Sequence, residues 1–147
     1  MKNDKVAILL VISFCVLLTS LGTSIANIAL PVFEEAFSTT FQLVQWVTIS
    51  YLLAITVSVT IVGKLADQYG HRRILLTGLL LFTIASFLCA FAPTISALIL
   101  MRALQGMGAA VLMTMSVTIV KKNNKTVKMG SAMGLIGTLS AVGTAMG

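Results

Sequence analysis

The first group of residues that could do chemistry is a charged segment at 63–73, between two long apolar stretches. Asp67 lies between two glycines, and Arg72 and Arg73 follow it. We interpret the segment as a tight loop in which Gly70 permits a sharp reversal of the backbone. A contact between an aspartate and an arginine is charge-assisted and geometrically demanding, so it could hold a gate in one conformation and break in another. The alternative is a connecting loop that only carries the charge bias of its side of a membrane.

A second group is centred on Arg102, which lies inside an apolar stretch. An arginine at membrane depth costs from about 3 to more than 10 kcal/mol, so we expect its side chain to face the protein interior or a watery cavity. Gln105 follows one helical turn later on nearly the same face, and Gly106 then thins the helix for close packing. The alternative is that Arg102 snorkels to the outer interface, about 9 Å away at 1.5 Å per residue.

Asn27 is a further polar residue inside an apolar stretch. It could line a cavity, or it could form a hydrogen bond between helices, worth about 1 kcal/mol. The sequence contains no hydrolytic, nucleotide-binding or metal-binding motif, so we expect no enzyme activity, no cofactor and no metal. Cys15 and Cys89 both lie in apolar stretches and are interpreted as packing residues.

The elements that must position these residues are membrane-spanning helices. The chain is 58% hydrophobic and only 10% charged, whereas an ordinary soluble domain is about 25% charged. A helix of about 20 apolar residues crosses a bilayer. The sequence therefore predicts an all-α, polytopic membrane protein with five helices, at 6–30, 43–62, 74–92, 96–120 and 129–147. The first apolar stretch is too long for a cleaved signal peptide, so we interpret it as a retained span.

The distribution of charge predicts the topology. The net charge is +6, but the basic residues are spread between the spans, which argues against nucleic-acid binding. The segments at 31–42 and 93–95 contain no Lys or Arg, whereas the N-terminus and the other two connections do. The positive-inside rule then places the N-terminus in the cytoplasm. Pro31 is expected to end the first helix, with an outer loop at 32–42.

The predicted fifth span is rich in glycine, and its spacing favours close contact between helices in lipid. Two pairs of glycines are four residues apart. These pairs are Gly130 with Gly134, and Gly143 with Gly147.

Three stretches of this sequence resemble signatures of the major facilitator superfamily. The segment at 63–73 resembles its gating-loop signature through Gly63, Leu65, Ala66, Asp67, Gly70 and Arg72, with departures at Gln68 and His71. A helix-four signature, whose arginine is linked to proton coupling in that family, is matched by Leu98, Arg102, Gln105, Gly106, Gly108, Ala109 and Ala110. The start of the helix-five antiporter signature is matched by Gly134, Gly143 and Gly147.

The stretch 27–31, which begins with Asn27, resembles the helix-one signature of the drug:proton antiporter branch with fourteen helices. That branch has an aspartate five residues before the asparagine, where this chain has Gly22. The antiporter signature continues with Pro-x-x-Gly-Gly beyond the position matched by Gly147, so we expect residues 1–147 to be a partial N-terminal half of a transporter.

The resemblance implies five helices of a six-helix half bundle, in a protein of the plasma membrane. It implies proton-coupled efflux of drugs or amphiphilic small molecules by alternating access. The partners would be the substrate, protons, the bilayer and the missing C-terminal helices, and we expect no transport by the 147 residues alone. One alternative is a short membrane scaffold or regulatory subunit. Another is a small exporter that dimerises, although the predicted spans lack the acidic residue that it would need.

Overall fold

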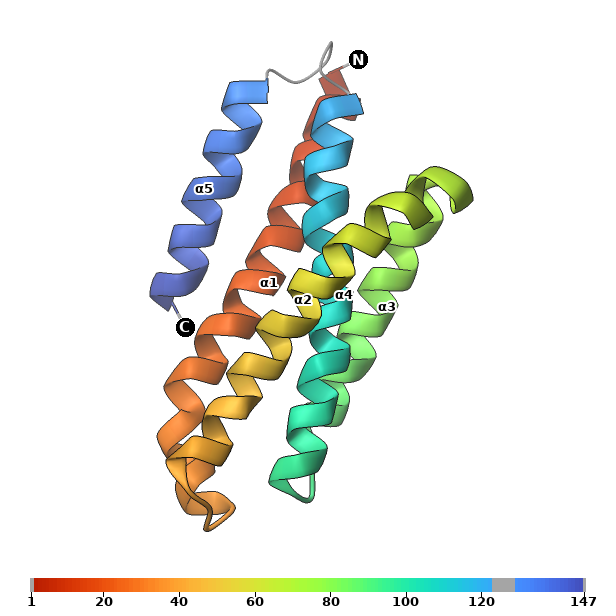
Figure 1. Cartoon of the computed structure of the whole chain (residues 1–147). Helices are drawn as coiled ribbons and strands as arrows, with labels where there is room; N and C mark the ends of the chain where they lie inside the picture. The colour runs from red at the N-terminus through yellow and green to blue at the C-terminus, as the bar shows by residue number, and fades with distance from the viewer. Residues whose placement is uncertain (1, 123–128, 147) are drawn as a thin grey trace.

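A computed structural model describes residues 2–122 and 129–146, and these residues form five helices and no strand. The helices are α1 (Lys2–Ala36), α2 (Phe41–Tyr69), α3 (His71–Ala90), α4 (Ile95–Lys122) and α5 (Met129–Met146). They run up and down in one bundle (Figure 1). Helices α1 to α4 contain stretches long and apolar enough to cross a membrane, whereas the apolar stretch of α5, Met133–Ala145, is shorter. The prediction of an all-helical, polytopic membrane protein is confirmed.

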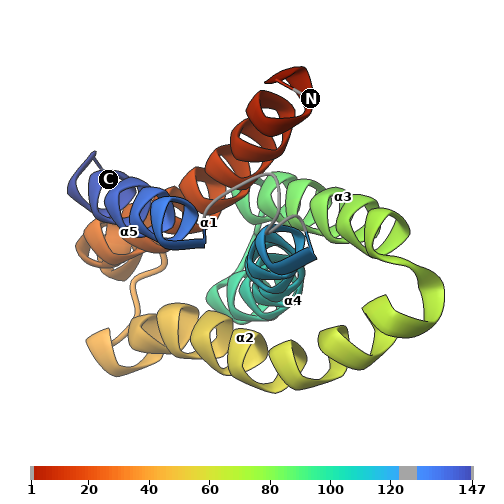
Figure 2. The same cartoon turned by 90° about the horizontal axis from the view of Figure 1, so that it is seen from above.

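Helix α4 lies at the centre of the bundle. Seen from above, α1, α2 and α3 surround it, and α5 lies on the far side of α1 (Figure 2). The most extensive contacts of α4 are with α2 and α3, and those of α5 are with α1. A helix that packs on several sides must bury apolar or small residues all round, which matches the even apolar character of α4.

Two glycines allow α4 to lie this close to its neighbours. A Cβ atom at Gly106 would overlap the backbone carbonyl oxygen of Tyr51 in α2. A Cβ atom at Gly108 would lie 2.7 Å from the backbone nitrogen of Phe82 in α3. Because Cβ atoms do not approach backbone atoms so closely, these crossings require glycine.

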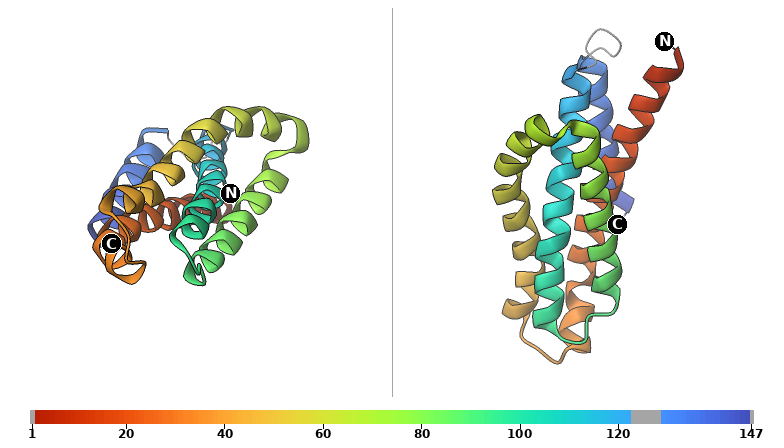
Figure 3. Two further views of the ribbon diagram at one scale, coloured as in Figure 1. Left: turned by 60° about the horizontal axis from the view of Figure 1, so that its bottom comes forward. Right: turned by 90° about the vertical axis from the view of Figure 1, so that its right-hand side faces the viewer.

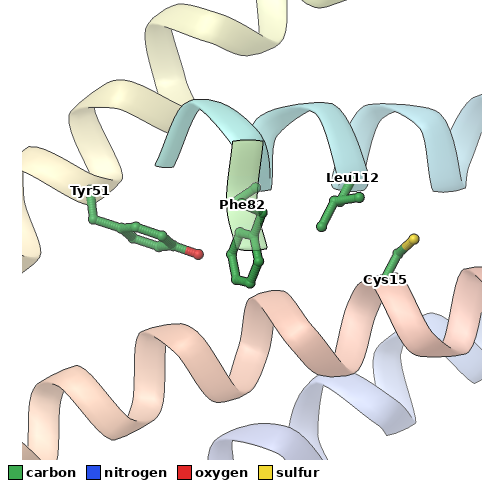
Figure 4. Close-up of a cluster of buried hydrophobic side chains, with 5 residues drawn as sticks. Cys15, Tyr51, Phe82 and Leu112 are labelled. Atoms are coloured by element: carbon green, nitrogen blue, oxygen red, sulfur yellow. The ribbon is translucent and has the colours of Figure 1, made fainter. Parts of the chain in front are cut away.

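The centre of the core joins the first four helices. Cys15, Tyr51, Phe82 and Leu112 come from α1, α2, α3 and α4 in turn and form one buried cluster with Ala109 (Figure 4). The interpretation of Cys15 as a packing residue is confirmed by its position there.

The predicted end of the first helix is wrong. Helix α1 continues through Pro31 to Ala36, so the predicted outer loop at 32–42 shrinks to residues 37–40. A proline removes one backbone donor and disturbs the preceding turn, but Glu34 and Ala36 after it are good helix formers. The backbone N–H of Phe37 still donates to the carbonyl of Phe33, at 3.0 Å.

The predicted loop at 63–73 is also wrong in extent. Helix α2 runs to Tyr69 and α3 begins at His71, so Gly70 alone makes the turn. Its φ is 89°, a conformation that glycine adopts without the steric cost that other residues meet, and its N–H donates to the carbonyl of Ala66 at 3.1 Å. The residues before it, with Lys64 among them, are mostly strong helix formers, which explains why α2 does not end earlier. Helices α3 and α4 begin and end within three residues of 74–92 and 96–120.

The connections lie at two opposite ends of the bundle. The N-terminus, the α2–α3 turn and the C-terminal end of α4 lie at one end, and the α1–α2 and α3–α4 connections lie at the other (Figures 1 and 3). The helix ends of the first group carry the basic residues Lys64, Arg72, Arg73 and Lys121, and the C-terminal end of α1 carries Glu34 and Glu35. The alternation of basic and non-basic connections in the sequence thus corresponds to the two ends of the molecule.

Candidate functional site

Arg102 lies in the interior of the bundle. Only 7% of its surface is exposed. Its Nη1 atom donates to the backbone carbonyl of Gly22 in α1 at 2.9 Å and to Oε1 of Gln105 at 3.0 Å. Among the two expectations for this arginine, the geometry agrees with the inward-facing one, because a side chain that snorkels would extend to the bundle surface.

The hydrogen bonds continue from Gln105 into α3. Gln105 is only 5% exposed, and its Nε2 atom donates to Oγ of Ser86 at 2.6 Å. The Ser86 hydroxyl in turn donates to the carbonyl of Phe82 at 2.7 Å. A connected network, which we call the Arg102 network (Gly22, Ser86, Arg102 and Gln105), therefore joins α1, α3 and α4. Sequence reasoning did not single out Ser86, since a hydroxyl in an apolar stretch usually bonds its own helix.

The positive charge of Arg102 has no carboxylate partner in the described part of the chain. The four acidic residues of the sequence are Asp4, Glu34, Glu35 and Asp67. The hydrogen bonds of Arg102 go instead to a backbone carbonyl and to the side-chain amide of Gln105. The Nε atom of Arg102 is buried and has no hydrogen-bond partner among the described residues. Burying an unpaired charge lowers the stability of the fold. The presence of Arg102 in the interior is therefore not explained by stability alone.

A cavity of about 390 Å³ opens beside this arginine. It lies between the C-terminal ends of α1 and α3 and the N-terminal part of α4. Arg102 lines it together with mostly apolar residues, among them Phe33, Phe37, Cys89 and Leu98. The cavity therefore combines one buried cation with an apolar wall.

Asn27 does not belong to the Arg102 network. Its Oδ1 atom accepts a hydrogen bond from the hydroxyl of Thr48 in α2, at 3.1 Å, and its side chain is exposed. This geometry agrees with the structural alternative, a bond between two helices.

The residues of the segment at 63–73 lie at the α2–α3 turn. Asp67, Arg72 and Arg73 are exposed, and none forms an ion pair with another residue that the structure describes. No atom would lie within 4 Å of a Cβ added at Gly63, and Leu65 is half-buried. The contact between aspartate and arginine is therefore not made in this conformation, and its role in a gate stays a prediction.

The antiporter glycines of α5 differ in their surroundings. A Cβ atom at Gly143 would lie 2.6 Å from Cβ of Ser20 in α1, whereas Gly134 has nothing within 4 Å of that position. Gly147 lies outside the described residues. The Ser24 hydroxyl of α1 donates to the carbonyl of Thr144 at 2.9 Å, and the Ser20 hydroxyl donates to that of Ser140 at 3.3 Å, so both serines help to position α5.

Comparison with known proteins places these features in a family. The sequence model of the Major Facilitator Superfamily matches residues 12–147. The chain is 34% identical over 145 residues to the riboflavin transporter RibZ of Clostridioides difficile (strain 630). This alignment covers 99% of this chain and 32% of that protein. The chain is also 37% identical over 107 residues to multidrug resistance protein 3 of Bacillus subtilis (strain 168). That alignment covers 73% of this chain and 21% of the relative.

A third relative is the tetracenomycin C resistance and export protein of Streptomyces glaucescens, 30% identical over 139 residues. That alignment covers 95% of this chain and 26% of the relative. The chain thus spans about a third or less of the length of these curated relatives.

Proposed function

This chain belongs to the Major Facilitator Superfamily, and we propose that it forms part of a transporter that exports drugs or other amphiphilic small molecules in exchange for protons. The observation that carries the proposal is the Arg102 network. A buried arginine without a carboxylate partner is expensive in a membrane protein, and such groups mark substrate or proton pathways. The names of two relatives, a multidrug resistance protein and a tetracenomycin C resistance and export protein, support efflux as the direction.

The proposed mechanism is alternating access, in which two bundles rock about a site near the middle of the membrane. Only Gly70 separates α2 from α3, so a movement at this end of the bundle would displace both helices together. In a second conformation, Asp67 and the neighbouring arginines Arg72 and Arg73 form the ionic contacts that this structure lacks. Arg102 then tunes the protonation of a neighbouring acid or organises water as protons are exchanged.

We further propose that the N-terminus is cytoplasmic and that the protein resides in the plasma membrane. The helix ends near the N-terminus carry Lys64, Arg72, Arg73 and Lys121, whereas the opposite end of α1 carries two glutamates. The positive-inside rule assigns the basic end to the cytoplasm.

The experiment uses everted membrane vesicles from cells that produce the complete transporter, and it compares Asp67→Asn with wild type. Wild-type vesicles with an acidic lumen should accumulate Hoechst 33342, and a protonophore should abolish the accumulation. Asp67→Asn should remove accumulation while the amount of protein in the membrane stays the same. Gln68→Asn is the matched control, because it changes an exposed polar neighbour on the same turn and should leave accumulation intact. Equal accumulation in Asp67→Asn and wild type would refute the role of Asp67. No accumulation by either protein would favour the scaffold alternative.

A further inference from the structure

We propose that the cavity beside Arg102 binds the carboxylate of an amphiphilic small molecule, with the carboxylate on the guanidinium and the apolar body against the aromatic wall. Only the idea that this molecule is transported rests on the proposed function. Binding itself can be measured without transport.

The charge requirement follows from the unused donor of Arg102. Both of its hydrogen bonds use Nη1, so Nη2 and the enclosed Nε have no hydrogen-bond partner among the described residues. Arginine pairs best with a planar anion that accepts hydrogen bonds from a whole edge of the guanidinium, as a carboxylate does. Among the residues that the structure describes, the oxygens that accept hydrogen bonds from this arginine are a backbone carbonyl and a neutral amide.

The apolar requirement follows from the rest of the wall. Arg102 is the only charged residue among those that line the cavity, and the side chains of Phe33, Phe37 and Leu98 face the same space. The volume of about 390 Å³ lies within the range of small-molecule sites, about 300–1,000 Å³. A bare inorganic anion would satisfy the charge and leave the apolar wall uncovered, so a one- or two-ring acid fits the site better.

A carboxylate introduced at residue 22 would compete with such a ligand for Arg102. A Cβ atom at residue 22 would meet Phe82 Cζ at 3.4 Å and Gln105 Nε2 at 3.8 Å, both ordinary contact distances. Because Arg102 already bonds the backbone oxygen of residue 22, an aspartate there would bring a carboxylate within reach of the guanidinium. Gly22→Asp should therefore fill the site from within, and Gly22→Asn is its uncharged control.

The thiol of Cys89 reports on occupancy, because it is partly exposed and lines the same cavity. The purified protein, carrying Cys15→Ala so that Cys89 is its sole cysteine among the described residues, is reacted with N-ethylmaleimide in micelles. The probes are 1-naphthoate and its neutral isostere 1-naphthamide. At a naphthoate concentration near ten times its dissociation constant, alkylation should slow about tenfold. Naphthamide should need about ten times more ligand for the same protection, because it lacks the charge-assisted bond.

The variants separate a charge-specific site from simple partition into an apolar space. Gly22→Asp should abolish the advantage of naphthoate over naphthamide, and Gly22→Asn should retain it. Arg102→Gln should abolish it too, and Arg102→Lys, which keeps a charge, should retain part of it. Equal protection by both probes in the wild type, or protection by acetate as strong as by naphthoate, would overturn the proposal. Charge-specific protection without export of naphthoate would leave the binding site standing and refute only its role in transport.

Discussion

Gly108 is a residue at which the backbones of α4 and α3 lie close together, and Gly108→Ala tests whether that contact holds the bundle together. The added Cβ would lie 2.7 Å from the backbone nitrogen of Phe82 and 2.8 Å from its Cα. The two helices would have to separate by roughly 0.7 Å to restore the shortest ordinary contact of 3.4 Å. Because the obstructing atoms belong to the backbone, no side-chain rotation can relieve the overlap.

The expected cost follows from two opposing terms. Overpacking of this kind lowers the stability of the folded state by about 1–3 kcal/mol. Replacing a helical glycine with alanine raises it by about 0.5–1 kcal/mol. Taken at the middle of both ranges, the net loss is about 1 kcal/mol and should lower the melting temperature by about 2–4 °C. The assay is thermal unfolding of the purified chain in dodecyl maltoside micelles, followed by far-UV circular dichroism.

Gly63→Ala is the matched control for this prediction. Gly63 also lies inside a helix, but a Cβ there would have no atom within 4 Å. Its replacement should leave the melting temperature unchanged or raise it slightly. Equal shifts of the melting temperature in Gly108→Ala and Gly63→Ala would contradict the packing role assigned to Gly108.

Two further predictions concern single polar or backbone features. Ser86→Ala should destabilise the chain by about 1–3 kcal/mol, because the buried amide of Gln105 loses its acceptor; equal melting temperatures for Ser86→Ala and wild type would contradict it. Gly70→Ala should cost about 1–3 kcal/mol, because φ at this turn is 89°. His71→Ala, one residue later, should cost much less, and similar losses for the two variants would refute the role assigned to the turn.

The sequence predicts the orientation of a side chain best where a high cost in free energy leaves few possible arrangements. An arginine deep in an apolar helix has to face inward or reach the surface, and Gln105 one turn later shares its face. The partners of this arginine were not predictable in the same way. Gly22 contributes a backbone carbonyl, which every residue possesses, and Ser86 is one of many hydroxyls in apolar stretches. Only the packing of α1, α3 and α4 selects these two.

The helix ends were harder to predict, for a local reason. Pro31 and the charged residues at 63–73 are all common in loops, and they indicated helix ends there. In the structure, α1 passes through Pro31 and α2 continues to Tyr69, because the neighbouring residues are strong helix formers. At the second site, only the positive φ of Gly70 breaks the helix. Motif residues that look like a loop can thus belong to two helices that meet at one glycine.

Our central proposal is that Arg102 serves transport and not stability. Arg102→Gln in the complete transporter tests this most directly, with export and melting temperature measured on the same preparation. We predict that export falls at least about tenfold, the equivalent of one charge-assisted hydrogen bond. The melting temperature should stay nearly the same, because the removal of a buried charge without a carboxylate partner in the described chain offsets the loss of the hydrogen bonds to Gly22 and Gln105. Unchanged export, or a loss of export that accompanies a lower melting temperature, would contradict the claim.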